Sequence, residues 1–411
     1  MLKLGVIGYG ARIRGVIGLL QKLTPDAVVV AITDVRNDEI RRDLTAAGRK
    51  PDEVRLYADA DEMLAREPLD GVMIGTRCSL HTPLALKVLQ RHLPLYLEKP
   101  VTTNQADWQR LYDGWRQTRS EVVVSFPLRM TPILLQTRDL IAAGTIGPVH
   151  HVQAWNNVPY GACYYLDWYR DEIETQGLFL QKATHDFDYL TYVLGLKPRR
   201  VAAMNAKLVY RGEMPARQSC DQCPIPRECP ESPFNIYYLR GGSDGVKPNG
   251  RRCGFAVDTG NEDSGSALVE YETGMHVVYS QNFFARQEAG ARGARFFGYK
   301  GTVEFDWYTD EVRVFFHHVP KTATYKFDTS KLGHGGGDVT LAWNFIEIMR
   351  GEARSVSPLS AGLRSTLMCL KAKESAQTHS FQDIPDVPGL EPDQSTPPAR
   401  LYQHATFQTI A

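Results

Sequence analysis

Long apolar runs and an excess of charge of either sign are both missing from this sequence of 411 residues. No apolar stretch reaches the roughly 18 residues that a membrane-spanning helix needs, and the chain starts directly in a strand-type pattern, without the segments of a secretory signal. Lysine plus arginine and aspartate plus glutamate both number 47, so no overall field favours nucleic acid or an anionic membrane. We therefore expect a cytoplasmic protein whose partner is a small molecule.

Cysteine is sparse, but four of the seven cysteines lie close together in the chain. Cys220 and Cys223 have CxxC spacing, Cys229 follows, and Cys253 stands beyond a loop rich in glycine and proline. In a reducing compartment such residues are thiols or metal ligands rather than disulfides. Four thiolates can surround one ion tetrahedrally and leave no open position for catalysis. The pattern predicts an irregular insertion over about residues 212–262 that holds a structural zinc ion, with an iron–sulfur cluster as second choice and free thiols as the alternative.

A glycine-rich turn follows the first apolar stretch. Residues 2–7 have the pattern of a buried strand, glycines stand at positions 8 and 10, and apolar residues then recur at helical spacing. Such a turn lets a pyrophosphate approach the backbone, and the amides at the start of the helix favour its negative charge. Because Ile13 stands where the usual fingerprint has its third glycine, a tight turn in another kind of α/β domain is the alternative.

A carboxylate ends the second apolar run. Asp34 follows residues 27–32 at the distance where an acidic side chain can accept hydrogen bonds from the ribose diol of a dinucleotide. Its charge favours NAD, since it would repel the 2′-phosphate of NADP, whereas Arg36 leaves NADP open as the less favoured cofactor.

Strand-type and helix-type segments alternate as far as residue 126. Six apolar runs separated by helical patterns predict a doubly wound parallel sheet, a Rossmann domain over 1–126. Strand-type runs then follow one another with short turns, which indicates an α+β domain with a large, mainly antiparallel sheet over 127–384. Helical patterns at 339–350 and 361–376 close that domain, and the proline-containing tail 385–411 is expected to run extended over a surface.

Several short motifs stand in a characteristic order along the chain. They are Gly8-Tyr9-Gly10, Glu98-Lys99-Pro100, Arg129 with Pro132, the turn 144–147, His185-Asp186-Phe187-Asp188 and the hairpin 298–302. Together they resemble the glucose–fructose oxidoreductase, inositol dehydrogenase and MocA (Gfo/Idh/MocA) family over roughly residues 1–380. The resemblance implies an open sheet for substrate and oligomer contacts in a homodimer or homotetramer. It also implies hydride transfer between a nicotinamide and a carbohydrate or cyclitol carbon.

The expected dinucleotide site joins the glycine-rich turn to residues at the ends of later strands. Thr76 and Glu98 each follow an apolar strand, at the carboxyl edge where open parallel sheets bind ligands. The residues expected to bind the cofactor are Gly8, Tyr9, Gly10, Ala11, Arg12, Ile13, Asp34, Thr76, His81, Glu98 and Lys99.

Lys99 and His185 are the first candidates for catalysis. An ammonium at the carboxyl edge of the sheet can polarise a substrate hydroxyl and stabilise a developing alkoxide; the alternative is a surface lysine paired with Glu98. The resemblance implies that His185 lies in the sugar site, where a neutral imidazole can take the hydroxyl proton. Its alternative role is to cap the helix that begins there.

The sequence departs from the family pattern just before His185. Gln181 stands where many relatives have aspartate, and Lys182 follows it, so a second ammonium is expected either to share the acid/base work or to neutralise an acidic substrate group. Arg129 and Arg170 are candidates for gripping an anionic group bidentately, unless they form salt bridges at the domain seam. Trp168 is expected to stack on a sugar face, unless its aromatic cluster is core.

These residues favour an NAD-dependent oxidoreductase that acts on a secondary hydroxyl of a sugar, glycoside or cyclitol. A second hypothesis is an NAD-dependent redox glycosidase, which oxidises the sugar transiently at C3 and returns the hydride. A third is a cofactor-sensing regulator without catalysis. The third ranks last because Lys99 and His185 are both present.

Overall fold

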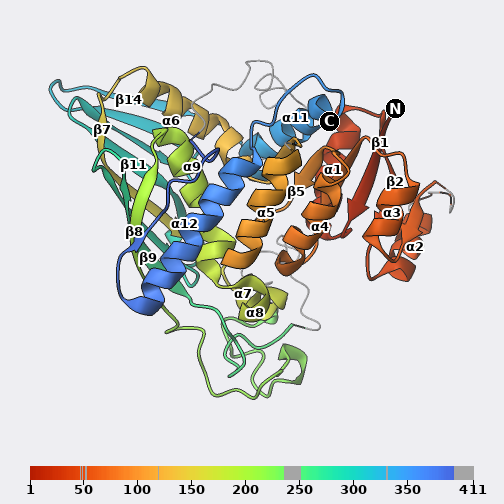
Figure 1. Ribbon diagram of the computed structural model, residues 1–411. Helices are drawn as coiled ribbons and strands as arrows, with labels where there is room; N and C mark the ends of the chain where they lie inside the picture. Colours follow the sequence, from red (N-terminus) through yellow and green to blue (C-terminus); the bar gives the residue numbers. More distant parts are fainter. Residues whose placement is uncertain are drawn as a thin grey trace.

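Two sheets organise the chain. The computed structural model describes residues 1–46, 48, 50, 53–118, 120–235, 251–329 and 332–392. A six-stranded sheet occupies the N-terminal part and a nine-stranded sheet the C-terminal part (Figure 1). In the described residues no helix is both long and apolar enough to cross a membrane.

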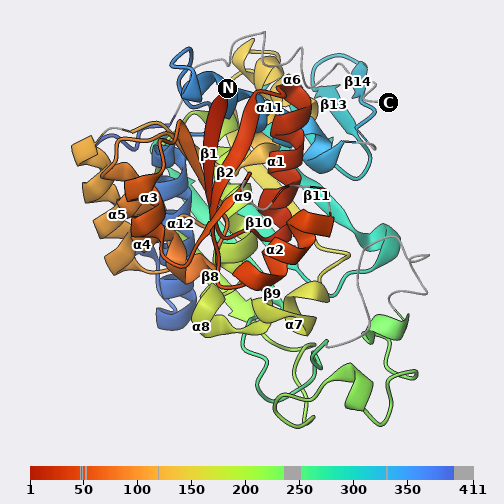
Figure 2. The same cartoon turned by 90° about the vertical axis from the view of Figure 1, so that its right-hand side faces the viewer.

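The first sheet is parallel throughout, in the order β3-β2-β1-β4-β5-β6. Its strands are β1 (Leu2–Ile7), β2 (Ala27–Thr33), β3 (Arg55–Tyr57), β4 (Gly71–Ile74), β5 (Leu95–Leu97) and β6 (Val122–Val124). The connecting helices are α1 (Ala11–Leu23), α2 (Asn37–Ala46), α3 (Ala60–Arg66), α4 (His81–Leu89) and α5 (Gln105–Thr118). Figure 2 shows α1 and α2 on one side of the sheet and α3, α4 and α5 on the other, as right-handed crossovers require. This confirms the expected Rossmann fold.

The second sheet is antiparallel except for one pair. Its order is β14-β13-β12-β11-β7-β10-β9-β8-β15, and β7 (Val149–Asn157) runs parallel to β10 (His276–Asn282). The other strands are β8 (Pro198–Ala206), β9 (Ser264–Tyr271), β11 (Ala291–Gly298), β12 (Gly301–Asp306), β13 (Glu311–Phe316), β14 (Thr322–Lys326) and β15 (Gln382–Asp383). The expected mainly antiparallel sheet is confirmed.

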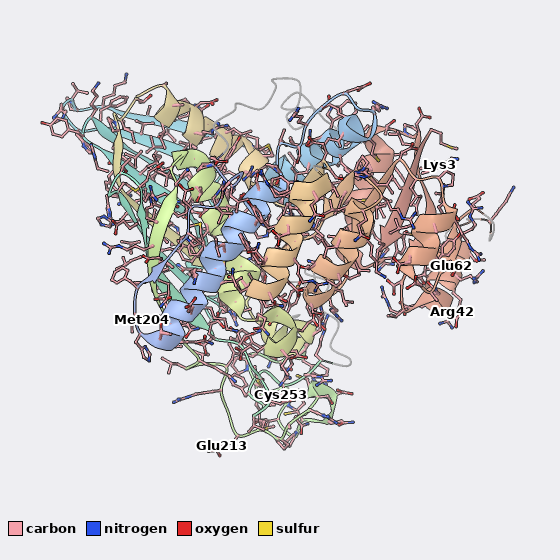
Figure 3. The ribbon with its side chains drawn as sticks, viewed as in Figure 1. Lys3, Arg42, Glu62, Met204, Glu213 and Cys253 are labelled. Atoms are coloured by element: carbon pink, nitrogen blue, oxygen red, sulfur yellow. The ribbon has the colours of Figure 1, made fainter. Side chains whose placement is uncertain are left out.

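Helices cover one face of this second sheet. These helices are α6 (Pro132–Ala142), α9 (Thr184–Leu194) and α12 (Leu359–Thr378), and Figure 1 shows all three on the same side of it. Exposed and buried residues alternate along β10, which is the pattern of a strand with one face in the core. Figure 3 shows Met204 among the side chains on the opposite face.

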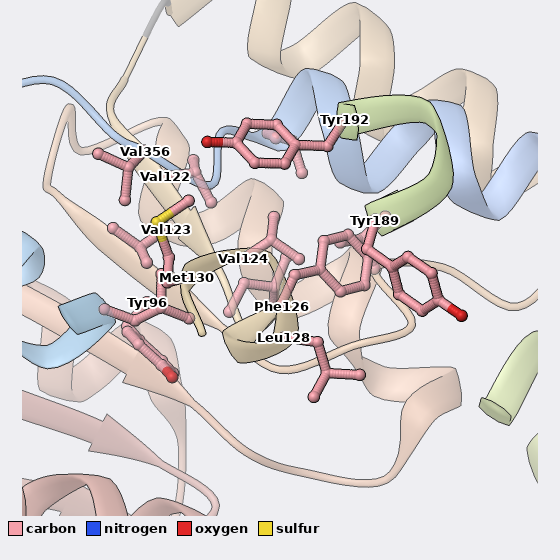
Figure 4. Close-up of a cluster of buried hydrophobic side chains, with 14 of the residues drawn as sticks. Tyr96, Val122, Val123, Val124, Phe126, Leu128, Met130, Tyr189, Tyr192 and Val356 are labelled. Carbon is pink, nitrogen blue, oxygen red and sulfur yellow. The ribbon is translucent and has the colours of Figure 1, made fainter. Parts of the chain in front are cut away.

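One hydrophobic core connects the two sheets. Figure 4 shows side chains of β5, β6 and the turn after β6 beside Tyr189 and Tyr192 of α9. The C-terminal helices continue this contact, since α11 (Gly337–Met349) packs on α1 and α12 packs on α5. Loops that follow the parallel strands and loops of the second domain are thereby held against each other.

The cysteine-rich segment is an irregular extension below both sheets, where Figure 3 labels Cys253. Cys220, Cys223, Cys229 and Cys253 are free thiols. Among the described residues no three His, Cys, Asp or Glu side chains are arranged to hold a metal ion, so the structure does not support the expected zinc or iron–sulfur site. Burial raises the pKa of Cys220 to about 12, and the neighbouring thiols act in the same direction.

Two further expectations fall partly outside the described residues. The glycines at 241, 242 and 245 of the insertion lie outside them, as do residues 393–411 of the tail. The described start of the tail lies against α5 and α12, because Tyr112 donates to the carbonyl of Pro388 and Arg364 to that of Leu390.

Candidate active site

A cavity of about 930 Å³ opens at the carboxyl ends of the parallel strands. One wall follows these strand ends and includes Ile7, Thr33, Gly75, Glu98 and Ser125. The other wall comes from the second domain and includes Tyr160, Tyr164, Trp168, Tyr169, Gln181, Lys182, His185 and His334. The cavity spans the boundary between β1 and β4, where the strand order reverses and open α/β sheets bind their ligands.

The glycine-rich turn forms the floor at one end. Gly8 has φ +83°, and a Cβ there would lie 2.8 Å from the backbone nitrogen of Thr76, so both conformation and space require glycine. Gly10 is the N-cap of α1, and Gly10, Ala11 and Arg12 line the cavity. The first amides of α1 are thereby available to an anionic group.

The missing third glycine is compensated on the sheet side. Ile13 is fully buried, and a Cβ on Gly75 would lie 1.9 Å from its Cγ1 atom. The close approach of α1 to the sheet is therefore made by a glycine at the end of β4 instead of one in the helix. Ile13, expected at the cofactor, is packed beneath the turn and does not line the cavity.

Asp34 lines the cavity and is held as a carboxylate. It accepts hydrogen bonds from the backbone N–H of Tyr9 at 2.7 Å and of Arg36 at 2.9 Å, and from the Arg36 guanidinium. Burial alone would raise the pKa of Asp34, but these bonds lower it below its ordinary value. Tyr9 takes part through its backbone.

Arg12 connects three side chains at the base of the cavity. Its guanidinium donates to Glu98 at 3.0 Å, to Ser125 at 3.1 Å and to both carboxylate oxygens of Asp338, at 2.8 and 2.5 Å. Asp338 also bonds to Nδ1 of His334 at 2.8 Å. The N-cap of α11 is Gly336, so Asp338 binds side chains across the cleft rather than capping its helix.

His81 and Lys99 occupy the strand ends next to this group. The His81 ring nitrogens lie 2.7 Å from the carbonyl oxygen of Pro100 and 3.3 Å from that of Thr76, so this side chain links two cavity-lining loops. Lys99 donates to the carbonyl of Gln181 at 3.0 Å. Burial lowers the pKa of Lys99 to about 8, which places its proton exchange near neutral pH.

Lys182 and His185 approach from the second domain. Lys182 lies in a π-helical turn, Phe179–Ala183, that leads into α9, a distortion that often occurs at functional sites. Its ammonium donates to the Tyr160 hydroxyl, and burial, followed by the charge of Arg292, lowers its pKa to about 7.

His185 is a neutral imidazole. Burial, followed by the positive charges of Lys99, Arg292 and Lys182, holds the pKa of His185 well below its ordinary value. Its buried Nδ1 atom has no hydrogen-bond partner among the described residues. An imidazole in this state can accept a proton from a bound hydroxyl.

The two arginines expected to bind substrate are in buried ion pairs elsewhere. Arg129 is bidentate to Asp188, and Arg170 bonds to Asp258, Thr259 and the carbonyl of Cys253. Neither guanidinium is part of the cavity lining. Both arginines therefore form salt bridges, which was the alternative expectation for them.

Trp168 lines the cavity, but protein groups already contact its ring. The Arg77 guanidinium lies 3.9 Å from the ring centroid, and the Tyr169 ring is stacked with centroids 3.9 Å apart. A sugar stacked on Trp168 would have to displace one of them. The aromatic cluster therefore acts as a wall of the cavity.

Sequence reasoning assigned no role to several cavity residues, Tyr160 and Arg77 among them, and considered His334 only as part of a glycine-rich turn that either reaches the site or enters a helix. Tyr160 reaches Lys182 from the aromatic loop, Arg77 follows β4 directly, and His334 lies in a glycine-rich turn with φ +46°. The unusual backbone of His334 is the kind of local strain that accompanies functional sites. The only available signals were the density of aromatic residues and of glycine around them.

Comparisons with known proteins identify the family. The model for "Oxidoreductase family, NAD-binding Rossmann fold" matches residues 2–126, and that for "GFO/IDH/MocA C-terminal domain" matches residues 134–304. The putative oxidoreductase YteT of Bacillus subtilis is 26% identical over 68% of this chain and 73% of its own length. Myo-inositol 2-dehydrogenase of Thermotoga maritima is 25% identical over 77% of this chain and 88% of its own length.

Solved structures agree in fold. A levoglucosan dehydrogenase in complex with NADH and levoglucosan aligns with a TM-score of 0.73 at 16% identity, over 94% of this chain and 100% of its own. An oxidoreductase domain protein from Kribbella flavida aligns with a TM-score of 0.74 at 16% identity, over 94% of this chain and 99% of its own. With models of both halves matching in order, the chain belongs to the Gfo/Idh/MocA family of NAD-binding oxidoreductases.

Proposed function

We propose that this oxidoreductase transfers hydride between NAD and a secondary hydroxyl of a sugar, glycoside or cyclitol. The observation that carries the proposal is the neutral, buried His185 beside Lys99 and Lys182 in one cavity with the dinucleotide turn. Two relatives point to the same substrate class, since one is named a myo-inositol 2-dehydrogenase and another a levoglucosan dehydrogenase.

The residues at the glycine-rich end fit a dinucleotide. Gly8 lets the turn pack against Thr76, where a Cβ would collide. The N-terminal amides of α1 suit a pyrophosphate, and ionised Asp34 suits a ribose diol. NAD would supply the hydride acceptor or donor at this site. Because Asp34 is an anion, NADP is the less favoured cofactor, although Arg36 lies beside it.

The chain's own groups divide the acid/base work. Lys99, held by the carbonyl of Gln181, polarises the substrate hydroxyl and stabilises negative charge on its oxygen. His185 takes the hydroxyl proton, and Lys182 with Tyr160 holds the substrate against the second-domain wall. The ion pair between Arg292 and Asp186 supports this wall from behind. Asp186 also accepts hydrogen bonds from Asn156 and Tyr279.

The test is one absorbance time course with NAD and a panel of cyclitols, sugars and nitrophenyl glycosides, in which reduced nicotinamide and nitrophenol are recorded together. Reduction of NAD without nitrophenol is the expected result. Nitrophenol release that needs NAD but produces no net reduction would replace the proposal with a redox glycosidase. If Lys99→Ala and the parent chain show equal turnover in every assay, the proposed chemistry is wrong and a regulator becomes the better hypothesis.

We propose that a homodimer or homotetramer forms through the uncovered face of the second sheet. Met204, Leu268 and Val278 on this face are 75%, 45% and 39% exposed, and Leu268 pairs directly with Val278 across β9 and β10. Leu268→Lys should therefore reduce the mass measured by light scattering. An unchanged mass, or a parent chain that is already monomeric, would contradict this proposal.

A further inference from the structure

The cations that line the cavity are not all paired with acids. At the dinucleotide end, Arg12 is paired with Glu98 and Asp338, Arg36 with Asp34, and Lys87 with Asp61. At the other end, Lys99 and Lys182 have no ion pair within the described residues, where their hydrogen bonds go to the Gln181 carbonyl and the Tyr160 hydroxyl.

The acid nearest to Lys182 in the chain is already engaged. Asp186 forms an ion pair with Arg292 and accepts further bonds from Asn156 and Tyr279, so it compensates the arginine. Lys182 itself is only 5% exposed. A buried ammonium without an anion is unfavourable, which is why the pKa of Lys182 falls to about 7. An anionic ligand would stabilise the charged form.

Further hydrogen-bond capacity lies around this ammonium. The Tyr160 oxygen accepts the bond from Lys182, which leaves its own O–H available as a donor. Burial raises the pKa of Tyr160 to about 12, so the phenol keeps its proton.

We infer that the part of the cavity lined by Tyr160 and Lys182 binds an anionic oxygen group of the substrate, and that the substrate is a sugar acid or its glycoside carrying a carboxylate. This inference rests on the proposed function and narrows its substrate class. One ammonium and one phenol match a carboxylate, whereas a phosphate dianion is usually held by arginine forks or a helix N-terminus. Arg129 and Arg170 are engaged in buried ion pairs away from the cavity, and Arg77, which lines the cavity, lies over the Trp168 ring.

The experiment compares ligands that differ only in the acid group, with the NAD-loaded protein. The pairs are glucose with glucuronate, galactose with galacturonate, and methyl glucoside with methyl glucuronide, and glucose 6-phosphate tests for a phosphate. Dissociation constants come from titration calorimetry, and kcat/KM comes from NAD reduction. We expect at least one acid to bind about tenfold or more tightly than its neutral partner, as a charge-assisted hydrogen bond allows.

Variants connect the preference to the site. Lys182→Gln should reduce the acid preference to within about twofold, and Tyr160→Phe, which keeps the ring, should reduce it by a smaller factor. Lys371→Gln, which removes a lysine paired with Glu374 on α12, is the matched control and should keep the preference. Because binding is measured separately, a variant that loses turnover still gives a result.

The outcomes separate the inference from the proposed function. Neutral members that bind or react as well as the acids overturn the inference and leave hydride transfer to a carbohydrate standing. A preference for glucose 6-phosphate replaces the carboxylate with a phosphate and overturns the substrate class. An acid preference that survives Lys182→Gln shows that the anion binds elsewhere. Failure of every pair to bind or react overturns the inference, and the panel of cyclitols and nitrophenyl glycosides then decides the proposed function by itself.

Discussion

At the scale of single residues, the site depends on three cationic or basic side chains whose pKa values are lowered by burial. Lys99 and Lys182 are brought to about 8 and about 7, and His185 well below its ordinary value. In an ordinary solvated position both lysines would be fully charged near neutral pH. Burial thereby brings the pKa values of the two lysines close to neutral pH, where general acid/base catalysis is most effective.

The pH profile of kcat/KM should reflect Lys99. A lysine that polarises the hydroxyl must be protonated, so activity should fall as the pH rises through about 8. The acid limb should lie below the ordinary histidine pKa of about 6.5, because His185 stays neutral to lower pH. In Lys99→Arg the side chain stays charged, so the fall in activity at alkaline pH that is due to Lys99 should disappear. We also expect kcat to fall by at least about 100-fold. A parent profile flat from pH 6 to 9 would contradict these roles.

The buried pair of Arg129 and Asp188 should matter for stability alone. Asp188→Asn leaves a fully buried guanidinium with a neutral partner, and breaking a buried ion pair typically costs about 3–5 kcal/mol. Urea unfolding measures this cost. Turnover per folded molecule and KM should stay within about twofold of the parent, since Arg129 does not line the cavity. A selective rise in KM without lost stability would return Arg129 to the substrate site.

At the scale of elements, the sequence patterns predicted what depends on local chemistry. The turn at Gly8 and Gly10, the carboxylate at Asp34, and the strand that ends at Glu98 and Lys99 are all defined within short segments of chain. The helices expected at 339–350 and 361–376 appear as Gly337–Met349 and Leu359–Thr378. Apolar periodicity thus located the elements and left their ends uncertain by about two residues.

The contact between Ile13 and Gly75 explains how α1 packs without the third glycine. Gly75→Ala would place a methyl group inside the Ile13 side chain, and overpacking of this kind costs about 1–3 kcal/mol. We expect lower stability in urea and weaker NAD binding by calorimetry. The double variant Gly75→Ala with Ile13→Ala should recover NAD binding, because it restores the space, while the loss of the buried Ile13 side chain keeps the stability low. No recovery would mean that Gly75 is needed for its backbone conformation instead.

At the scale of the whole molecule, the site residues come from loops that are distant in sequence. Arg12 of the cavity and its partner Asp338 are 326 residues apart, and outside the cavity Arg170 and its partner Asp258 are 88 residues apart. No local pattern reveals such partners, which is why Arg129 and Arg170 were expected at the substrate. Residues that depend only on their position at a strand end, such as Glu98 and Lys99, were predictable because the topology of parallel sheets fixes that edge.

The Arg12–Asp338 ion pair makes the dinucleotide site dependent on the second domain. Arg12 positions Glu98 and Ser125, and its bidentate bond to Asp338 anchors α11 to the start of α1. Asp338→Asn weakens these charge-assisted bonds, so we expect a loss of about 1–2 kcal/mol, or about 5- to 30-fold in the dissociation constant of NAD measured by calorimetry. Asp383→Asn, at an exposed position of β15, is the matched control. One outcome would contradict this prediction: both variants bind NAD like the parent, and Asp338→Asn alone unfolds at a lower urea concentration. The ion pair would then hold the two domains together without affecting NAD binding.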